Sequence, residues 1–292
     1  MRHVAEKDLV RRTGSKEVHR RVFIACEGYK TEVHYFERLV SESGRLGLYG
    51  RVEVVVMNRY RPERGISDPK RLLEMCIDHM TFLETKMCTS NLFRSIVLDA
   101  AGEEHKSMID SMMGDRRISD MTDDDGFLND FHEAAEFASD YLSERGVEVS
   151  VVFDDHMYDP ETDIVFLVVD RDQGKERPAE SYLGFLAGCY DSGFRPVVTN
   201  PRFELWELMH MDDVERDLME ISESRNPSSA LKKIMKRRSM DKDDPDYDYL
   251  VDHLDNAMRN SVPYVLNPDK LESEVGTNMP DIIGVLKGTD TR

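Results

Sequence analysis

The sequence predicts an α/β fold in which helices flank a mostly parallel sheet. Short apolar runs rich in strand formers alternate with stretches of helical periodicity, a pattern typical of βαβ units. The most apolar run, residues 164–169, has the continuous hydrophobicity of a strand that is buried on both faces. In such sheets, functional side chains gather at the carboxyl ends of the strands.

The expected strands and helices follow from these patterns. The strands are short apolar runs rich in strand-forming residues: 21–26, 51–57, 164–169 and 194–199. The helices carry apolar residues at helical spacing: 31–43, 67–80 and 182–190. Thr31 is available to cap the first of these helices. Pro201 suits a first helical position, so a further helix is expected to begin there and to continue to about residue 209.

The length of 292 residues suggests about two domains, at ~150 residues each. We expect a first part of the α/β core, a mainly helical insertion, a second part of the core, and a helical C-terminal region packed on that core: 1–80, 81–160, 161–211 and 212–292. The insertion is expected to contain two helices, an acidic loop and a strand: 106–113, 129–143, Asp120–Asp125 and Val147–Phe153.

The charge balance limits the function. The chain has 39 basic and 58 acidic residues, a net charge of -19, which argues against generic affinity for nucleic acid. An acidic protein that handles nucleic acid would need metal ions or a local basic patch. The one dense basic segment, Lys232–Arg238, either follows a nucleic-acid backbone or is a solvated helix face, and the solvated face is the favoured interpretation.

Several classes of protein are not supported. No apolar run approaches the roughly 20 residues that a membrane-spanning helix needs. The basic residues of the first twelve positions are not followed by the apolar segment of a secretory signal, so we expect a cytoplasmic protein. The four cysteines stand far apart, without CxxC pairs or zinc-ligand spacing, and are expected to be reduced, partly buried thiols.

Acidic side chains follow three of the expected strands. Glu27 comes directly after the first, Asp170 and Asp172 end the strand at 164–169, and Asn200 and Glu204 follow the last. At positions i and i+2 the two aspartates point to one side, while Arg171 points away. Convergence of these carboxylates would create a site for a hard cation, and oxygen-only ligands favour Mg²⁺ or Mn²⁺. Taken singly, these acids also suit caps, turns and helix-dipole partners.

Three motifs occur here in the order that they have in a known family. They are Cys26-Glu27-Gly28-Tyr29-Lys30-Thr31-Glu32 after the first strand, Val-Val-Asp170-Arg-Asp172, and Thr199-Asn200-Pro201-Arg202-Phe203-Glu204-Leu205-Trp206. The chain thereby resembles the RloB-like family over about residues 20–60 and 164–211. That family is similar to Toprim domains, which implies a Toprim-like sheet in which Glu27 corresponds to the Toprim glutamate and Asp170 and Asp172 to its DxD pair.

The resemblance also implies a function. It implies a metal-dependent nuclease effector that cleaves RNA, such as tRNA, or DNA in an anti-phage or abortive-infection system, often beside an ABC-type ATPase partner. The alternative is a non-catalytic regulatory or binding subunit of such an ATPase complex. The chain itself has no GxxxxGK[ST] motif, so the ATPase would be a separate protein, and a homo-oligomer is left open. The stretch between Glu27 and Asp170 is longer than a Toprim core needs, and the insertion accounts for the excess.

If the site is catalytic, the residues take the following roles. Glu27, Asp170 and Asp172 hold Mg²⁺ or Mn²⁺, and either Glu27 or Glu204 is the general base. Lys30 neutralises a phosphate oxygen, and Asn200 and Arg202 contact substrate at the start of the helix, with an ion pair to a site carboxylate the equal alternative for Arg202. Three further residues are candidates to support these groups: Thr31, Glu32 and Arg171. Solvent exposure is at least as good an interpretation for Glu32, and the large apolar side chains Phe203 and Trp206 are expected in the core.

Overall fold

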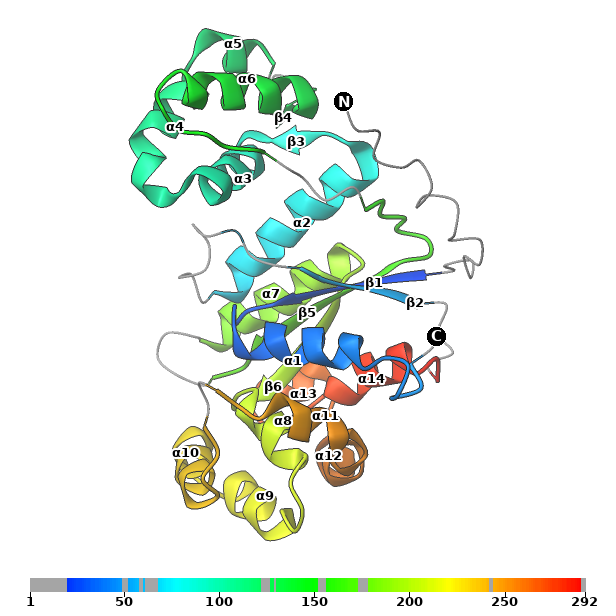
Figure 1. The fold of residues 1–292 in the computed structure, drawn as a ribbon. Helices are drawn as coiled ribbons and strands as arrows, with labels where there is room; N and C mark the ends of the chain where they lie inside the picture. The colour runs from blue at the N-terminus through cyan, green and yellow to red at the C-terminus, as the bar shows by residue number, and fades with distance from the viewer. Residues whose placement is uncertain are drawn as a thin grey trace, which may run out of the picture.

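A five-stranded, mostly parallel sheet with helices on both faces forms the centre of the molecule (Figure 1). The computed structural model describes residues 20–48, 52–57, 60, 68–121, 127–128, 130–151, 156–172, 178–241 and 244–289. The strands of this sheet are β1 (Arg20–Cys26), β2 (Val52–Met57), β5 (Ile164–Asp170), β6 (Arg195–Asn200) and β7 (Gly276–Thr277). They lie in the order β2-β1-β5-β6-β7, and β7 is antiparallel to β6. The predicted fold class is therefore confirmed.

Helices make up most of the remaining described chain. Those that connect the core strands are α1 (Thr31–Ser41), α2 (Pro69–Thr85) and α7 (Ala179–Asp191). Those between α2 and β5 are α3 (Ser90–Ala101), α4 (Lys106–Met113), α5 (Arg116–Asp120) and α6 (Phe131–Ser143). Those after β6 are α8 (Glu204–Met209), α9 (Glu215–Ser222), α10 (Pro227–Arg237), α11 (Tyr247–Asp252), α12 (Leu254–Ser261), α13 (Pro268–Leu271) and α14 (Met279–Leu286).

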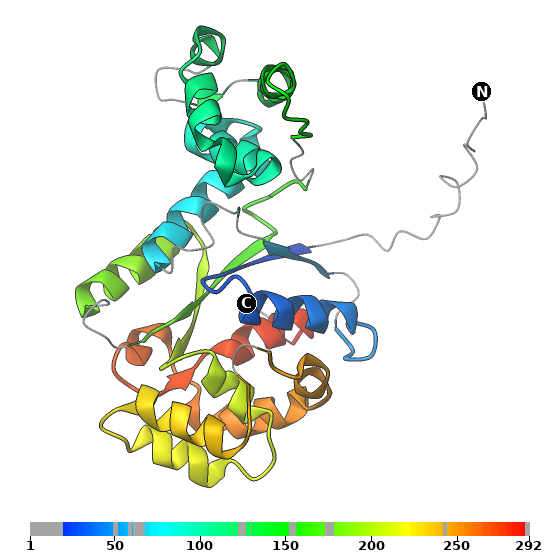
Figure 2. The same cartoon turned by 60° about the vertical axis from the view of Figure 1, so that its left-hand side comes forward.

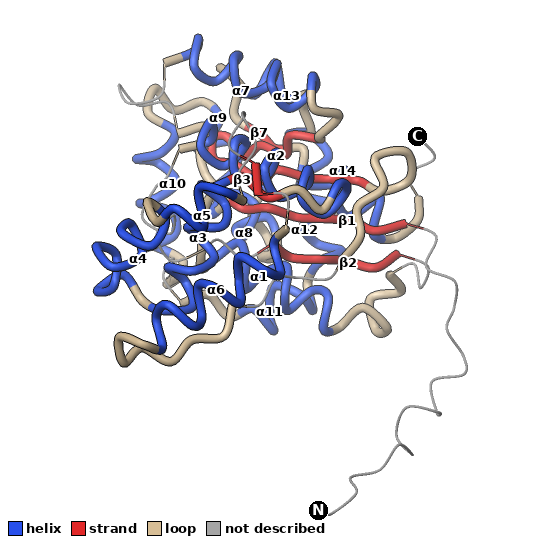
Figure 3. Tube along the Cα trace, turned by 90° about the horizontal axis from the view of Figure 1, so that it is seen from above, coloured by secondary structure: helices blue, strands red, loops and turns tan. Residues whose placement is uncertain are grey.

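The connections place a topological switch point between β1 and β5. From β1 the chain crosses through α1 to β2 at the sheet edge, whereas from β5 it crosses through α7 to β6 in the opposite direction. Helix α1 packs on one face of the sheet, and α2 and α7 pack together on the other. Figure 3 shows β1 and β2 side by side, with helices above and below the strands. In open α/β sheets, ligands bind beyond the strand ends at such a point.

Side chains alternate between two apolar clusters, one on each face of the sheet. Phe23 and Leu167 face α2 and α7, whereas Ile24 and Phe166 face α1 and the C-terminal helices. Gly188 on α7 allows α2 to approach closely, because a Cβ atom there would lie 2.5 Å from Cδ2 of Leu73. The core strands are consequently apolar on both faces, as parallel strands covered by helices must be.

The segment between α2 and β5 forms a helical group at one end of the molecule (Figures 1 and 2). Helix α2 begins against the sheet and ends beside β3 (Cys88–Thr89), which pairs with β4 (Phe127–Leu128) in a second small sheet. The apolar cluster on this face of the central sheet continues along α2 into α3, α4 and α6 without a break. Because α2 extends to Thr85, the boundary expected at residue 80 falls inside a helix.

Three local predictions were wrong. Thr31 does not cap α1: it is the first residue of that helix, the cap position is Lys30, and the Thr31 hydroxyl hydrogen-bonds Tyr247 instead. Pro201 does not begin a helix, because residues 201–203 form a turn that packs on the end of β5, and α8 begins at Glu204. No strand forms over the described part of Val147–Phe153, residues 147–151, and its last two residues lie outside the described chain.

Other predictions fall partly outside the described residues. Residues 122–125 of the acidic loop lie outside the described chain, as do the first nineteen residues.

The helices predicted at 106–113 and 129–143 are confirmed as α4 and α6. All four cysteines are free and buried. Among the described helices, none is both long and apolar enough to cross a membrane.

Candidate functional site

The site lies at the switch point, where β1 and β5 end side by side. Glu27 follows β1 directly, and its backbone N–H continues the strand ladder by donating to the carbonyl of Val168 (2.8 Å). Its carboxylate turns toward β5 and accepts the backbone N–H of Asp170 at Oε2 (3.2 Å). Glu27 is 4% exposed. The strand register thus places these two acids together, as the sequence predicts.

Asp170 is also tied to the turn after β6. Its Oδ1 accepts the backbone N–H of Phe203 (2.7 Å), the residue just before α8. The chain between β6 and α8 is therefore held against the end of β5, and Glu204 follows at the first position of α8. Phe203 and Trp206 are buried, as predicted.

Glu32 brings a further carboxylate to this place. It lies in the first turn of α1, and its carboxylate accepts the backbone N–H groups of Gly28 and of Glu32 itself. A Cβ atom on Gly28 would lie 1.9 Å from the Oε2 of Glu32, so a glycine is needed where the two segments meet. Glu32 is only partly exposed, because its side chain folds back over the loop after β1.

Glu207 completes the group, although it was not among the site residues predicted from the sequence. Its side chain is fully buried, and neither carboxylate oxygen has a hydrogen-bond partner. Glu204 and Glu32 both act on it electrostatically, which places it beside them. The available signal was the spacing Glu204-x-x-Glu207, since residues at i and i+3 share a helix face.

The electrostatics of the cluster follow from burial and like charge. Burial, then repulsion by Glu27 and Glu204, raises the pKa of Glu32 to about 7. The pKa of Asp170 lies well above its usual range because of burial and the charges of Glu32, Glu27 and Glu204. Burial, with the charges of Glu204 and Glu32, raises the pKa of Glu207 as well. Groups that titrate near neutral pH at a strand-end site are candidates for proton transfer or cation binding.

Asp172 has a different environment. Its Oδ2 accepts from Nη2 of Arg202 at 2.6 Å, and the hydroxyl of Ser228 at the start of α10 lies 3.5 Å from Oδ1. The residue has a φ angle of 24°, a strained conformation for a residue other than glycine, as often occurs at functional sites. Arg202 thus makes the ion pair that was one of its two predicted roles, and its buried Nε has no partner.

Other predicted site residues lie apart from the carboxylates. Asn200 is buried and donates from Nδ2 to the carbonyls of Leu271 and Glu274, which joins β6 to the C-terminal region. Arg171 points away from the aspartates, as predicted, and pairs with Glu272 at 3.1 Å. Lys30 is exposed, with its ammonium 5.6 Å from the centre of the Tyr29 ring.

A closed network of buried hydrogen bonds joins α1 to α8 and the residue that follows it. Trp206 Nε1 donates to the hydroxyl of Tyr35 on α1 (3.0 Å), and that hydroxyl lies 3.3 Å from Nε2 of His210. Nδ1 of His210 lies 2.9 Å from the carbonyl of Trp206, which can only accept, so Nδ1 carries the proton and Nε2 accepts from Tyr35. Burial lowers the pKa of His210 to about 4, so the ring is neutral at pH 7.

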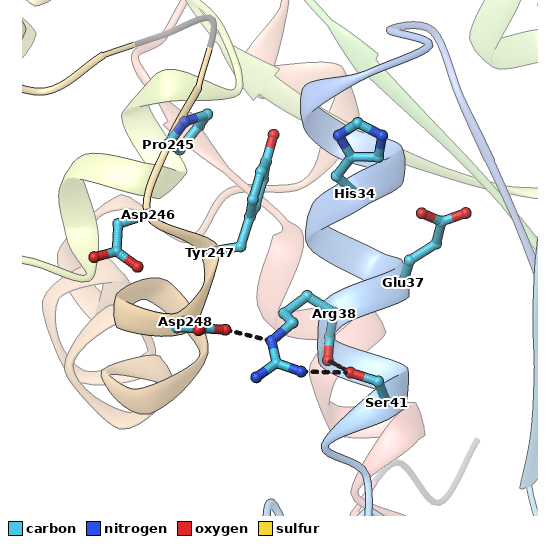
Figure 4. Close-up of a pocket in the computed structure, with 8 residues that line it drawn as sticks. All are labelled: His34, Glu37, Arg38, Ser41, Pro245, Asp246, Tyr247 and Asp248. Atoms are coloured by element: carbon cyan, nitrogen blue, oxygen red, sulfur yellow. Dashed lines mark hydrogen bonds and ion pairs between the residues drawn. The ribbon is translucent and has the colours of Figure 1, made fainter.

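A surface groove of about 520 Å³ lies between α1 and the segment that leads into α11 (Figure 4). Tyr247 stands opposite His34 there, with ring centres 5.8 Å apart. Its hydroxyl bonds Thr31, and burial and Glu207 raise its pKa to about 12. Figure 4 shows Arg38 bound to Asp248 and Ser41, so the charge of this lining residue is already neutralised.

The side chains as they stand do not form a ready-made metal cage. Within the described chain, no group of three or more His, Cys, Asp and Glu side chains is arranged to hold an ion. Glu27 and Asp170 accept backbone N–H groups, and Asp172 accepts from Arg202. Cation binding would therefore require some of these oxygens to exchange their present partners.

Comparison with known families identifies the chain. The family model described as RloB-like protein matches residues 22–286, nearly the whole length. The chain belongs to the RloB-like family. No curated protein and no solved structure matches it significantly. In this RloB-like protein the match includes every carboxylate of the cluster, together with the helical group between α2 and β5.

Proposed function

We propose that this RloB-like protein is a metal-dependent phosphodiesterase that cleaves nucleic acid. One observation carries the proposal: Glu27, Glu32, Asp170 and Glu204 meet at the switch point of the sheet, where burial and mutual repulsion raise the pKa values of Asp170 and Glu32. Stability alone gives no reason to collect repelling carboxylates at a strand end. A cation or a proton-transfer reaction gives such a reason.

The donor chemistry of the cluster fits a hard divalent cation. Only carboxylate oxygens are offered, which favours Mg²⁺ or Mn²⁺ over softer metals. The two unpartnered oxygens of Glu207 lie beside the cluster, where its raised pKa favours the protonated carboxyl. Glu27, Asp170 and Asp172 are the proposed ligands, and a bound ion would lower the pKa of water and neutralise charge on a phosphate.

The chain's own groups have distinct parts in this proposal. Glu32, with a pKa of about 7, is suited to exchange a proton at neutral pH, and it joins Glu27 and Glu204 as a candidate base. Lys30 is exposed at the residue before α1 and is the proposed contact to a phosphate oxygen. Arg202 holds Asp172 in position, and its guanidinium is the nearest described cation to that carboxylate.

Cleavage of nucleic acid tests the proposal. The purified protein with Mn²⁺ or Mg²⁺ is expected to cleave total tRNA or supercoiled plasmid DNA, and Asp170→Asn is expected to lose at least 100-fold in rate, within the ~10²–10⁴ range of a lost acid–base or charge-stabilising group. Asp191→Asn on the exposed end of α7 is the matched control and should retain the full rate. Equal activity in wild type and Asp170→Asn would indicate a contaminating nuclease and overturn the proposal.

Metal binding is measured separately from cleavage. Mn²⁺ at ~100 times its dissociation constant is expected to stabilise the wild-type protein by about 2.7 kcal/mol, and Asp170→Asn/Asp172→Asn by much less. Equal thermal shifts in both proteins would show that the carboxylates do not bind the ion. Nucleic-acid binding without cleavage would instead favour a non-catalytic subunit of an ABC-type ATPase complex. The anti-phage role and the choice of RNA or DNA rest on the family resemblance alone.

A further inference from the structure

The basic segment of α10 is divided into two sets of side chains with different surroundings. Arg237 pairs with Asp217 and Glu220 of α9, while Arg238 binds Asp217 and the carbonyls of Asp212 and Asp213. These two arginines fix α10 against α9. They are already neutralised and have a structural role.

The three lysines of the same helix have no such partners. Lys232, Lys233 and Lys236 are exposed, and within the described residues their ammonium groups make no ion pair or hydrogen bond. Two other described lysines do make ion pairs: Lys70 with Glu74 and Lys287 with Asp255. Glu220 and Glu223 line a groove that Lys233 also lines, yet neither forms an ion pair with it in the described part of the chain. In a chain with 58 acidic residues, three exposed lysines on one helix face therefore keep their charge without an ion pair.

The geometry of α10 points this face outward. The apolar side of the helix is buried against the C-terminal core: Ala230, Leu231, Ile234 and Met235. The lysines at 232, 233 and 236 occupy the opposite side, because the helix turns by 3.6 residues. Figures 1 and 2 show α10 on the outside of the molecule, beside α9.

The lysine face begins at the carboxylate site. Ser228, in the first turn of α10, approaches Asp172 to 3.5 Å. Lys232 is four residues after Ser228, so it lies about one turn further along α10 on the same side of the helix. The row from Ser228 to Lys236 is about 12 Å long at 1.5 Å per residue. Positive charge thus extends from Asp172 outward over the surface.

We propose that the α10 lysine face, defined as Lys232, Lys233 and Lys236, binds the phosphate backbone of nucleic acid and leads it to the carboxylate site. The inference rests on the proposed function, because it names the surface that holds the substrate. Charge complementarity selects the occupant: exposed lysines that make no ion pair within the described residues match a regular array of phosphates. The α10 lysine face also explains how a protein with a net charge of -19 could bind a polyanion, because such binding needs only a local positive surface.

Binding is measured without cleavage. Fluorescein-labelled 20-nucleotide single-stranded RNA and a 20-base-pair DNA duplex are titrated in EDTA, with anisotropy followed from 25 to 200 mM NaCl. The variant Lys232→Gln/Lys233→Gln/Lys236→Gln is compared with Lys70→Gln/Lys86→Gln/Lys106→Gln, which removes the same charge from α2, the residue that follows it and α4. Because each phosphate contact contributes about 0.9 to the salt slope on duplex DNA and 0.7 on single strands, the α10 variant should lose about 2–3 in slope and at least tenfold in affinity.

The outcomes separate the two proposals. The inference is supported if the α10 variant binds the probes more weakly than wild type while the affinity of the control variant stays within twofold of wild type. Equal weakening of both variants, an unchanged α10 variant, or no binding of either probe by wild type overturns it. If wild type cleaves while the α10 variant binds normally, the inference fails and the proposed function stands. If wild type binds through α10 without cleaving, the proposed function fails and the inference stands.

Discussion

Glu32 makes the stability of the protein depend on pH. Its pKa is raised from 4.5 to about 7 in the folded chain, so the folded state holds this proton more tightly than the unfolded state does. The contribution of this proton to the free energy of unfolding is fully present below pH 4.5 and is lost as the pH rises through 7, where the folded protein releases the proton. We expect Glu32→Gln to flatten the fall in unfolding free energy between pH 5 and pH 8.

Urea unfolding at pH 5, 6, 7 and 8, followed by circular dichroism, measures this effect. Glu37→Gln, at an exposed position of the same helix, is the matched control and should fall with pH as the wild type does. Parallel curves for Glu32→Gln and wild type would contradict the electrostatic coupling of Glu32 to the cluster. Asp170 and Glu207 also have raised pKa values, so some pH dependence remains in the variant.

At single residues, the sequence predicted the acids that directly follow strands and little beyond them. Glu27 and Asp170 meet because the parallel register of β1 and β5 aligns their ends. The spacing Glu204-x-x-Glu207 did not single out Glu207, because its complete burial without a partner arises only when α8 packs against α1 and α12. Asn200 looked equally suited to substrate, but the C-terminal segment that occupies its amide lies some seventy residues further along the chain.

Helices α1 and α8 are joined by the buried network of Trp206, Tyr35 and His210. Tyr35→Phe removes the acceptor for Trp206 Nε1 and the donor to His210 Nε2, which leaves two buried polar groups unpaired. Each unpaired group costs about 1–3 kcal/mol, so we expect a loss of about 2–4 kcal/mol. Chemical denaturation followed by the fluorescence of Trp206, the single tryptophan, measures it.

Tyr190→Phe serves as the comparison, since Tyr190 is half exposed on α7 and its hydroxyl should contribute within about 0.5 kcal/mol. A loss for Tyr35→Phe no larger than for Tyr190→Phe would rule out a stabilising role of the network.

Elements were predicted well where apolar periodicity was strong and poorly where one residue set a boundary. The core strands and the helices α1, α4, α6 and α7 lie where the pattern places them. The start of α8 was displaced because the Phe203 N–H bonds Asp170, a tertiary contact that holds residues 201–203 out of the helix. Proline preference at a first helical position is a local rule and does not include such a contact.

The whole molecule carries a net charge of -19, and this charge has a measurable effect. Repulsion among surface acids destabilises the compact state, and salt screens it: the Debye length falls from about 10 Å at 0.1 M to about 3 Å at 1 M. We expect the melting temperature at pH 8 to rise by several degrees as NaCl increases from 0.05 to 0.5 M.

The same titration near pH 5, close to the sequence pI of about 4.9, should produce a much smaller rise because the net charge is nearly zero. A fall in melting temperature with salt at pH 8 would mean that attractive ion pairs, such as those of Arg238 and Asp217, outweigh the repulsion.

Helix α2 joins two parts of the molecule through one continuous apolar cluster. The 17 residues of α2 form a rod of about 25 Å, at 1.5 Å per residue. One end of this helix packs against α7 and the sheet, and the other end packs against β3. A rotation of α2 by about 10° about its sheet end displaces the far end by about 4 Å, given that length. Helix α2 therefore connects the helices α3 to α6 rigidly to the sheet, so a tilt of those helices would be transmitted to the strands that carry Glu27 and Asp170.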